Sequence, residues 1–185
     1  RDLAQVCLAF RRIEFASPEL VLFCRRYARD RRRSLNTFEL AAVLLYASSA
    51  SGANPGLQEF VQDVADEVCI EWRQRESVPW VAWKMLVSSA AAAGVPHRRL
   101  FEAASPPLSQ SVRHMSGRDA VDVCKAYAAF RFKHTGLLGE LYRFLPSMGL
   151  SHREVVDLQT AFGRLGFDAP LLRSFHELHR AGSPP

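Results

Sequence analysis

The sequence has few cysteines, almost no lysine and no long uncharged apolar run, and each shortage excludes a class of protein. Its four cysteines, Cys7, Cys24, Cys69 and Cys124, stand singly in a chain of 185 residues, without a C-x-x-C pair. Isolated cysteines are typical of reduced core thiols rather than of a disulfide framework or a zinc site. We therefore expect free thiols, with Cys7 and Cys124 on the apolar faces of helices.

No stretch of about 18 uncharged apolar residues is present, so we expect no membrane span. The nearest stretch, residues 78–96, contains Lys84 and two serines, and we interpret it as a buried helix. Hydrophobic residues make up 48% of the chain, which is typical of a folded protein. The chain begins at Arg1 without an initiator methionine, so we expect a processed product or a fragment whose targeting segment is not visible.

Motifs for catalysis and metal binding are also missing. There is no glycine-rich phosphate loop, no G-x-S-x-G elbow and no H-E-x-x-H pair. His176 and His179 lie three residues apart beside Glu177, but no cysteine or aspartate cluster completes a metal site around them. We expect no enzymatic activity, no cofactor and no bound metal.

The positive charge is carried by arginine. Only three of the 24 basic residues are lysines, and the net charge is +5. Residues 1–33 hold nine arginines against four acidic residues, which accounts for the whole excess. Guanidinium groups pair bidentately with phosphate and stack on bases, so this segment is a candidate phosphate-binding surface. The alternatives are a solubilising surface and an arginine bias of the coding sequence. The candidate contacts here are Arg11, Arg12, Arg25, Arg26, Arg29, Arg31, Arg32 and Arg33.

Helix-forming patterns recur along the chain and predict a repeat array. Three polar pairs have the spacing of a capping box at a helix start: Asn36 with Glu39, Ser116 with Asp119, and Ser151 with Glu154. A marker residue that ends the first helix of each unit recurs every 35 to 43 residues, at Phe15, Gly52, Val95, Phe132 and Phe167. Five residues after each marker stands a leucine, namely Leu20, Leu57, Leu100, Leu137 and Leu172.

These patterns predict an all-α fold, an α-solenoid of about five degenerate two-helix repeats. The expected units cover approximately 1–35, 36–78, 79–115, 116–150 and 151–180, as a single domain over residues 1–180, with a tail or linker at 181–185. In the first unit the second helix is expected to bury Leu20, Phe23, Cys24 and Tyr27. In the third unit the prolines at 106 and 107 are expected to kink or shorten the second helix.

The joints between paired helices supply the remaining candidate contacts. His97 and His134 occupy the same repeat position, where a helix N-terminus favours phosphate; the alternative is a polar loop residue. Arg131 and Lys133 flank the second of these joints and complete the predicted set. Solenoids with a basic face commonly bind single-stranded or irregular RNA, which makes RNA the expected partner.

Three segments share one pattern. Each begins with an acidic residue, which is followed by an aliphatic residue four positions later and by an alanine and an aromatic residue seven and eight positions later. They are DLAQVCLAFRRIEF (2–15), DAVDVCKAYAAFRF (119–132) and EVVDLQTAFGRLGF (154–167). Units of this form resemble the organellar octotricopeptide and heptatricopeptide repeat proteins, of the type associated with RAP domains. The resemblance implies binding of organellar RNA, a mitochondrial matrix location, and a structural place in a mitochondrial ribosome, in contact with ribosomal RNA and neighbouring proteins.

The sequence departs from that family in two respects, since it contains no RAP domain and its second and third units are irregular. Loss of regularity favours a structural role over base-by-base reading of RNA. Two alternatives remain open at this point: a protein–protein scaffold subunit of another mitochondrial complex, and an organellar RNA-processing or translation factor.

Overall fold

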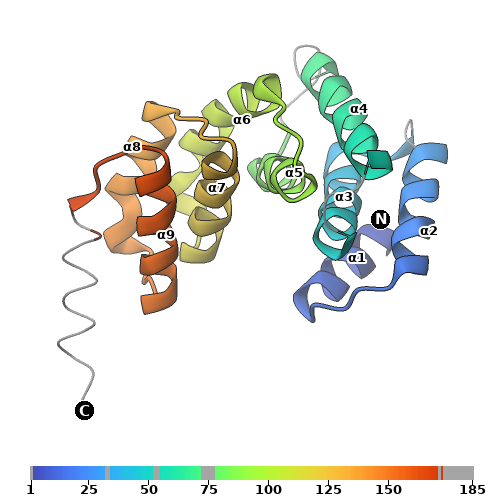
Figure 1. Ribbon diagram of the computed structural model, residues 1–185, viewed down its shortest axis with the longest axis horizontal. Coiled ribbons are helices and arrows are strands. Elements are labelled where there is room, and N and C mark those ends of the chain that lie inside the picture. Colours follow the sequence, from blue (N-terminus) through green and yellow to red (C-terminus); the bar gives the residue numbers. More distant parts are fainter. Residues whose placement is uncertain (1, 32–33, 52–54, 72–77, 171, 173–185) are drawn as a thin grey trace. The chain divides into compact units, whose positions relative to one another are not determined.

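The computed structural model describes residues 2–31, 34–51, 55–71, 78–170 and 172, and every regular element in these ranges is a helix (Figure 1). The prediction of an all-α fold is therefore confirmed. None of the described helices is long and apolar enough to cross a membrane. The helices are α1 (Asp2–Arg12), α2 (Pro18–Asp30), α3 (Thr37–Ser51), α4 (Pro55–Glu71), α5 (Trp80–Ala93), α6 (Arg98–Gln110), α7 (Gly117–Ala129), α8 (Thr135–Phe144) and α9 (His152–Arg164), with two short 3-10 helices, η2 (Val112–His114) and η3 (Leu145–Ser147).

The chain divides into two compact units, residues 1–104 and 105–185, with the border inside α6. In the first unit, α3 packs against α1, α2 and α5, and α4 packs against α5 (Figure 1). Residues 40–48 of α3 are all buried, which suits a helix that is apolar on every side. In the second unit, α7 packs against α9, and α8 contacts η2 and η3.

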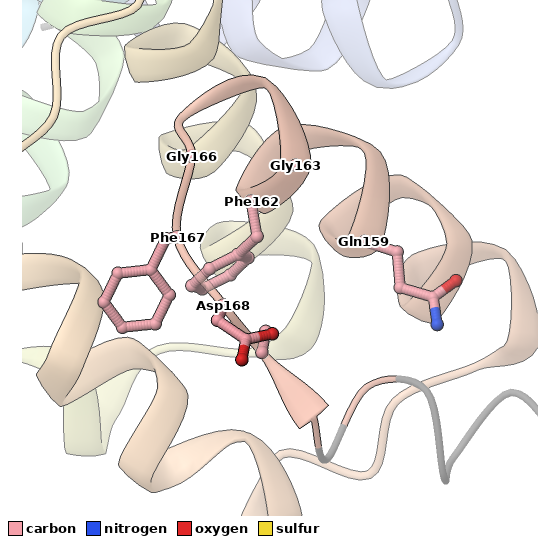
Figure 2. Close-up of a pocket in the computed structure, with 7 residues that line it drawn as sticks. Gln159, Phe162, Gly163, Gly166, Phe167 and Asp168 are labelled. Atoms are coloured by element: carbon pink, nitrogen blue, oxygen red, sulfur yellow. The ribbon is translucent and has the colours of Figure 1, made fainter.

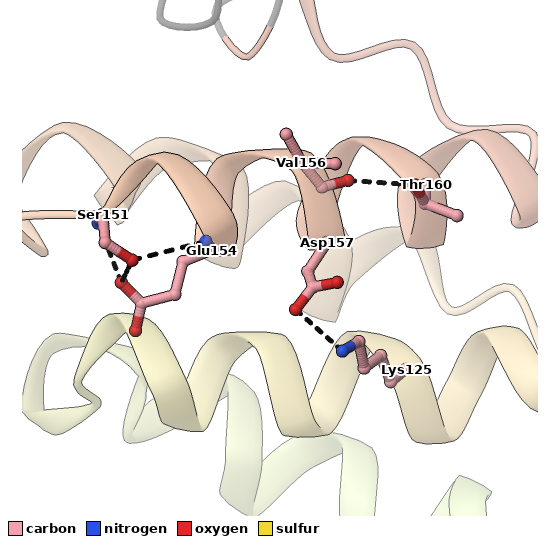
Figure 3. Close-up of polar contacts among 6 residues, drawn as sticks. All are labelled: Lys125, Ser151, Glu154, Val156, Asp157 and Thr160. Atoms are coloured by element: carbon pink, nitrogen blue, oxygen red, sulfur yellow. Dashed lines mark hydrogen bonds and ion pairs between the residues drawn. The ribbon is translucent and has the colours of Figure 1, made fainter. Parts of the chain in front are cut away.

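Helix starts follow the local capping chemistry that the sequence predicts. All three predicted capping boxes are present. In α9, Ser151 Oγ accepts the amide of Glu154 at 3.4 Å, and the Glu154 carboxylate accepts the amide of Ser151 at 2.8 Å (Figure 3). The Ser116–Asp119 pair and the Asn36–Glu39 pair make the same reciprocal bonds. These caps fix the starts of α3, α7 and α9.

The ends of α1, α5, α7 and α9 share one geometry. Each has a residue with a positive φ one or two positions beyond the last helical residue: Glu14 (53°), Gly94 (71°), Arg131 (52°) and Gly166 (60°). The next amide then donates to the carbonyl five residues earlier, in the bonds Phe15 to Phe10 (2.9 Å), Val95 to Ala90 (2.8 Å), Phe132 to Tyr127 (3.0 Å) and Phe167 to Phe162 (3.0 Å). This bond and the positive φ define a Schellman motif.

The residues that close these motifs are four of the five predicted markers, and the fifth, Gly52, lies outside the described residues. Three of them are aromatic and pack on an aromatic ring of the same helix: Phe10 with Phe15, Tyr127 with Phe132, and Phe162 with Phe167, at centroid distances of 5.0, 5.8 and 5.2 Å. The leucines that follow are buried at 57, 100, 137 and 172, whereas Leu20 is half-buried. Sequence period and helix geometry therefore coincide.

The two prolines of α6 neither interrupt nor shorten it, so the expected early end is wrong. The helix runs for 13 residues with Pro106 and Pro107 inside it. Each proline lacks the amide that would bond the carbonyl four residues back. Within the second unit, buried Ser105 shares a hydrogen bond of 2.9 Å with the hydroxyl of Tyr127 in α7. This side-chain bond holds the proline-containing end of α6 in place.

Candidate nucleic-acid interface

Helix α2 carries three of the predicted arginine contacts, Arg25, Arg26 and Arg29, and Arg31 directly follows it; the orientation of the helix decides which of them face solvent. Ser17 caps the helix by accepting the amide of Leu20, and Pro18 occupies the first helical position. The buried residues of α2 are the small side chains Val21, Cys24 and Ala28. Such a narrow stripe of small side chains lets α2 lie close to α3.

This packing leaves two large apolar residues outside the core. Leu22 is 51% exposed and Phe23 is 53% exposed, so the prediction that Phe23 is buried is wrong. Cys24 is buried as predicted, whereas Leu20 and Tyr27 are only half-buried. The hydrophobic pattern favoured the bulkiest residues for the core face, but the buried residues are the small ones, Val21, Cys24 and Ala28.

Three side chains form a row along one side of α2, at spacings of four residues. The rings of Phe23 and Tyr27 lie with their centroids 5.9 Å apart and their planes at 32°. The guanidinium carbon of Arg31 lies 5.9 Å from the centroid of the Tyr27 ring. We call these residues, Phe23, Tyr27 and Arg31, the α2 row. Its composition, two π faces and a guanidinium, is typical of surfaces that stack on bases.

The other arginines of the first unit have different environments. Arg26 and Arg29 are exposed on α2, and no acidic side chain pairs with either of them in the part of the chain that the structure describes. Arg25 is half-buried instead, with Nη2 only 2.6 Å from the point where a Cβ on Gly56 of α4 would lie. Arg25 therefore packs against α4 rather than facing solvent.

The other predicted contacts of this unit are Arg11 and Arg12 of α1 and the adjacent pair Arg32 and Arg33. Arg12 is exposed at the end of α1, and Arg11 is half-buried with a partner of its own. Arg32 and Arg33 lie outside the described residues.

The two histidines of the predicted set are helix caps. Nδ1 of His97 accepts the amide of Leu100 at 3.0 Å, and Nδ1 of His134 accepts the amide of Leu137 at 3.1 Å. Both residues thus occupy the place that Ser17 has in α2, and their shared repeat position reflects shared capping. A ring nitrogen that accepts an amide carries no proton, so the proton of each neutral ring is on Nε2.

His97 also binds inside the first unit through its second nitrogen. Nε2 lies 3.0 Å from Oδ1 of Asp66 in α4, and only 6% of the residue is exposed. The hydrogen bond from His97 holds the pKa of Asp66 below its usual value, although partial burial opposes this. Both ring nitrogens are engaged, so we leave His97 out of the interface that we propose below.

Arg131 and Lys133 belong to the second unit and flank the joint between α7 and α8. Arg131 is the exposed residue with positive φ in the ending of α7. Lys133 Nζ donates to the carbonyl of Gly166 at 2.7 Å, which caps the ending of α9. Lys125 of α7 pairs with Asp157 of α9 at 2.8 Å (Figure 3). These lysines therefore tie α7 and its joint to α9.

An open hollow of about 570 Å³ lies beside the ending of α9, lined by both rings of that Schellman motif, Phe162 and Phe167 (Figure 2). Among the described residues that line it, Asp168 is the charged one. Gln159, also in the lining, donates to the carbonyl of Leu172 at 2.7 Å. No basic or nucleophilic side chain is found among the described lining residues.

No cluster of histidine, cysteine and carboxylate groups that could hold a metal ion is found among the described residues, and His176 and His179 lie outside them. Comparison with known proteins assigns no family: no protein-family model matches the chain, and no curated protein matches it significantly.

Proposed function

We propose that this chain is an RNA-binding helical-repeat protein, a structural component of a mitochondrial ribosome that contacts ribosomal RNA in the mitochondrial matrix. The observation that carries the proposal is the exposed face of α2. There Arg26, Arg29 and Arg31 are exposed, and Arg31 lies against the ring of Tyr27, which neighbours the ring of Phe23. Arginine in this setting favours a polyanion with planar groups, because guanidinium pairs with phosphate and stacks on bases.

Repeated geometry supports the helical-repeat part of the proposal. Four first helices end in the same Schellman motif at the predicted marker residues. We propose that the helix pairs are about five degenerate repeats of one solenoid over residues 1–180. Stacked repeats present a long surface to a partner, as a component that wraps irregular RNA requires.

The mitochondrial and ribosomal part rests on the resemblance of residues 2–15, 119–132 and 154–167 to organellar repeat proteins. The irregular second and third units favour a structural role over an RNA-processing or translation factor. A protein scaffold in another mitochondrial complex is the second candidate. It is favoured by the exposed apolar residues Val6, Ile13, Phe15, Leu22, Phe23 and Ile70 of the first unit.

The arginine face is tested by removing its charge. A triple variant, Arg26→Ala, Arg29→Ala and Arg31→Ala, should bind single-stranded RNA at least about tenfold more weakly at low salt, because three phosphate contacts are lost. The measurement is fluorescence anisotropy with a labelled oligonucleotide. A matched control removes the same charge from exposed arginines of the second unit, Arg118, Arg153 and Arg164. Equal weakening by both triples, or by neither, would remove the assignment to α2.

The ribosomal assignment needs the native particle. Sequencing of RNA crosslinked to this chain in isolated mitochondria should return ribosomal RNA. Recovery of messenger or precursor RNA would favour a processing or translation factor instead. A nuclease-resistant association with proteins alone would favour the scaffold.

A further inference from the structure

We infer that the α2 row stacks on unpaired bases, so that this surface takes single-stranded RNA and discriminates against duplex RNA. The inference rests on the proposed function. It adds which form of RNA is bound, single-stranded RNA, and which residue contacts its bases. Phosphate contacts alone would accept either form. The aromatic part of the row, and above all Phe23, supplies the discrimination.

The geometry of the row suits a base. Phe23 is 53% exposed, whereas the neighbouring Tyr27 is half-buried, and their ring planes are tilted by 32°. Arg31 closes the other end of the row against Tyr27. A flat base placed on the exposed ring of Phe23 would add a further π face to the row, and only an unpaired base presents an open face to it.

Charge around the row selects a nucleic acid over an apolar protein surface. Arg26 and Arg29 lie on α2 and Arg31 directly follows its end, all within eight residues of Phe23, and all three are exposed. An apolar partner that covered Phe23 would bury unpaired guanidinium groups nearby, at a large desolvation cost. A single strand satisfies both demands, because its phosphates meet the arginines while its bases meet the ring.

The experiment separates stacking from charge with three probes of equal length. They are a labelled single-stranded oligouridylate, the same length of duplex RNA, and an abasic strand that keeps the backbone phosphates but has no bases. The full chain should bind the oligouridylate best. Phe23→Ala should weaken that binding by about tenfold and leave abasic binding unchanged. Arg29→Ala should weaken binding of both.

Two further variants serve as controls. Phe23→Trp keeps a stacking ring and should restore the affinity for the oligouridylate. Val156→Ala removes an apolar side chain, 37% exposed, from α9 in the second unit and should change nothing. Circular dichroism of each variant checks that the helices remain folded.

The results distinguish this inference from the function on which it rests. If the chain binds no RNA, the proposed function itself fails. If the chain binds abasic and base-bearing strands equally, or if Phe23→Ala has no effect, the RNA-binding function stands and base stacking is overturned.

Discussion

At the scale of single residues, two glycines at the end of α9 differ in their backbone torsion φ. Gly163 is helical, whereas Gly166 has φ of 60°, and neither has an atom within 4 Å of an added Cβ. Gly163→Ala should therefore stabilise the fold by about 0.5 kcal/mol through helix propensity. Gly166→Ala should destabilise it by about 1 kcal/mol, because a Cβ disfavours the left-handed conformation. Urea denaturation measures both, and the same sign for both would contradict this account.

The bond between His97 and Asp66 predicts a dependence of stability on pH. Asp66 has a lowered pKa in the folded state, so its charge stabilises the fold above the unfolded pKa, and this contribution is lost as pH falls through the folded value. Asp66→Asn keeps an acceptor but has no charge. Its deficit in stability should be complete at about pH 6 and should shrink below about pH 4.

Because the Asp66 side chain is 52% exposed, solvent screening keeps that deficit small. The measurement is the urea midpoint of wild type and variant across the pH range. The control is Glu59→Gln, at an exposed position of the same helix, and it should lack the pH-dependent stability deficit of Asp66→Asn. A deficit that grew as pH fell would contradict the assigned direction.

At the scale of elements, two cysteines connect α1 with α2. The sulfur atoms of Cys7 and Cys24 lie 3.5 Å apart, and both side chains are fully buried. The hydrogen bond between them, together with burial, raises the pKa of Cys7. The expectation of buried free thiols is confirmed for this pair, but their contact was not predicted, since 17 residues separate them and no C-x-x-C spacing marks them.

Diamide should therefore form one intramolecular disulfide, Cys7–Cys24, as the two thiols lose two hydrogens to the reagent. The cross-link should stabilise the first unit by about 3 kcal/mol, as expected for a loop of this length. Peptide mapping after alkylation identifies the pair. Cys7→Ser should abolish the product, because it removes one of the two sulfur atoms in contact. A product that joins Cys69 instead would contradict the assigned pair.

Helix starts were predictable because capping is local. Ser116 reaches Asp119 within one turn, whatever packs on the helix afterwards. The buried face of α2 was not predictable in the same way. Its hydrophobic pattern fits two overlapping stripes, and the choice between Phe23 and Val21 depends on how closely α3 approaches, which no local pattern specifies.

At the scale of the molecule, the recurring helix ending was predictable, whereas the environments of the candidate site residues were predictable only in part. Markers such as Phe132 recur because each closes the same helix ending. The arginine count pointed to the first unit, but it could not separate Arg25, which packs on α4, from Arg29, which faces solvent. It also could not show that His97 has both nitrogens engaged. These distinctions depend on neighbours far away in the sequence.

The two kinds of contact proposed for RNA binding, charge contacts to phosphates and stacking on bases, should respond differently to salt. Each phosphate neutralised on a single strand contributes about −0.7 to the slope of log affinity against log salt, so Arg26, Arg29 and Arg31 alone predict a slope near −2. Arg29→Ala should make the slope shallower by about 0.7. Phe23→Ala should lower the affinity at every salt concentration with the slope unchanged, because stacking releases no counterion. Anisotropy titrations over a range of salt concentrations measure both effects, and an equal change of slope in the two variants would contradict the division between charge and stacking.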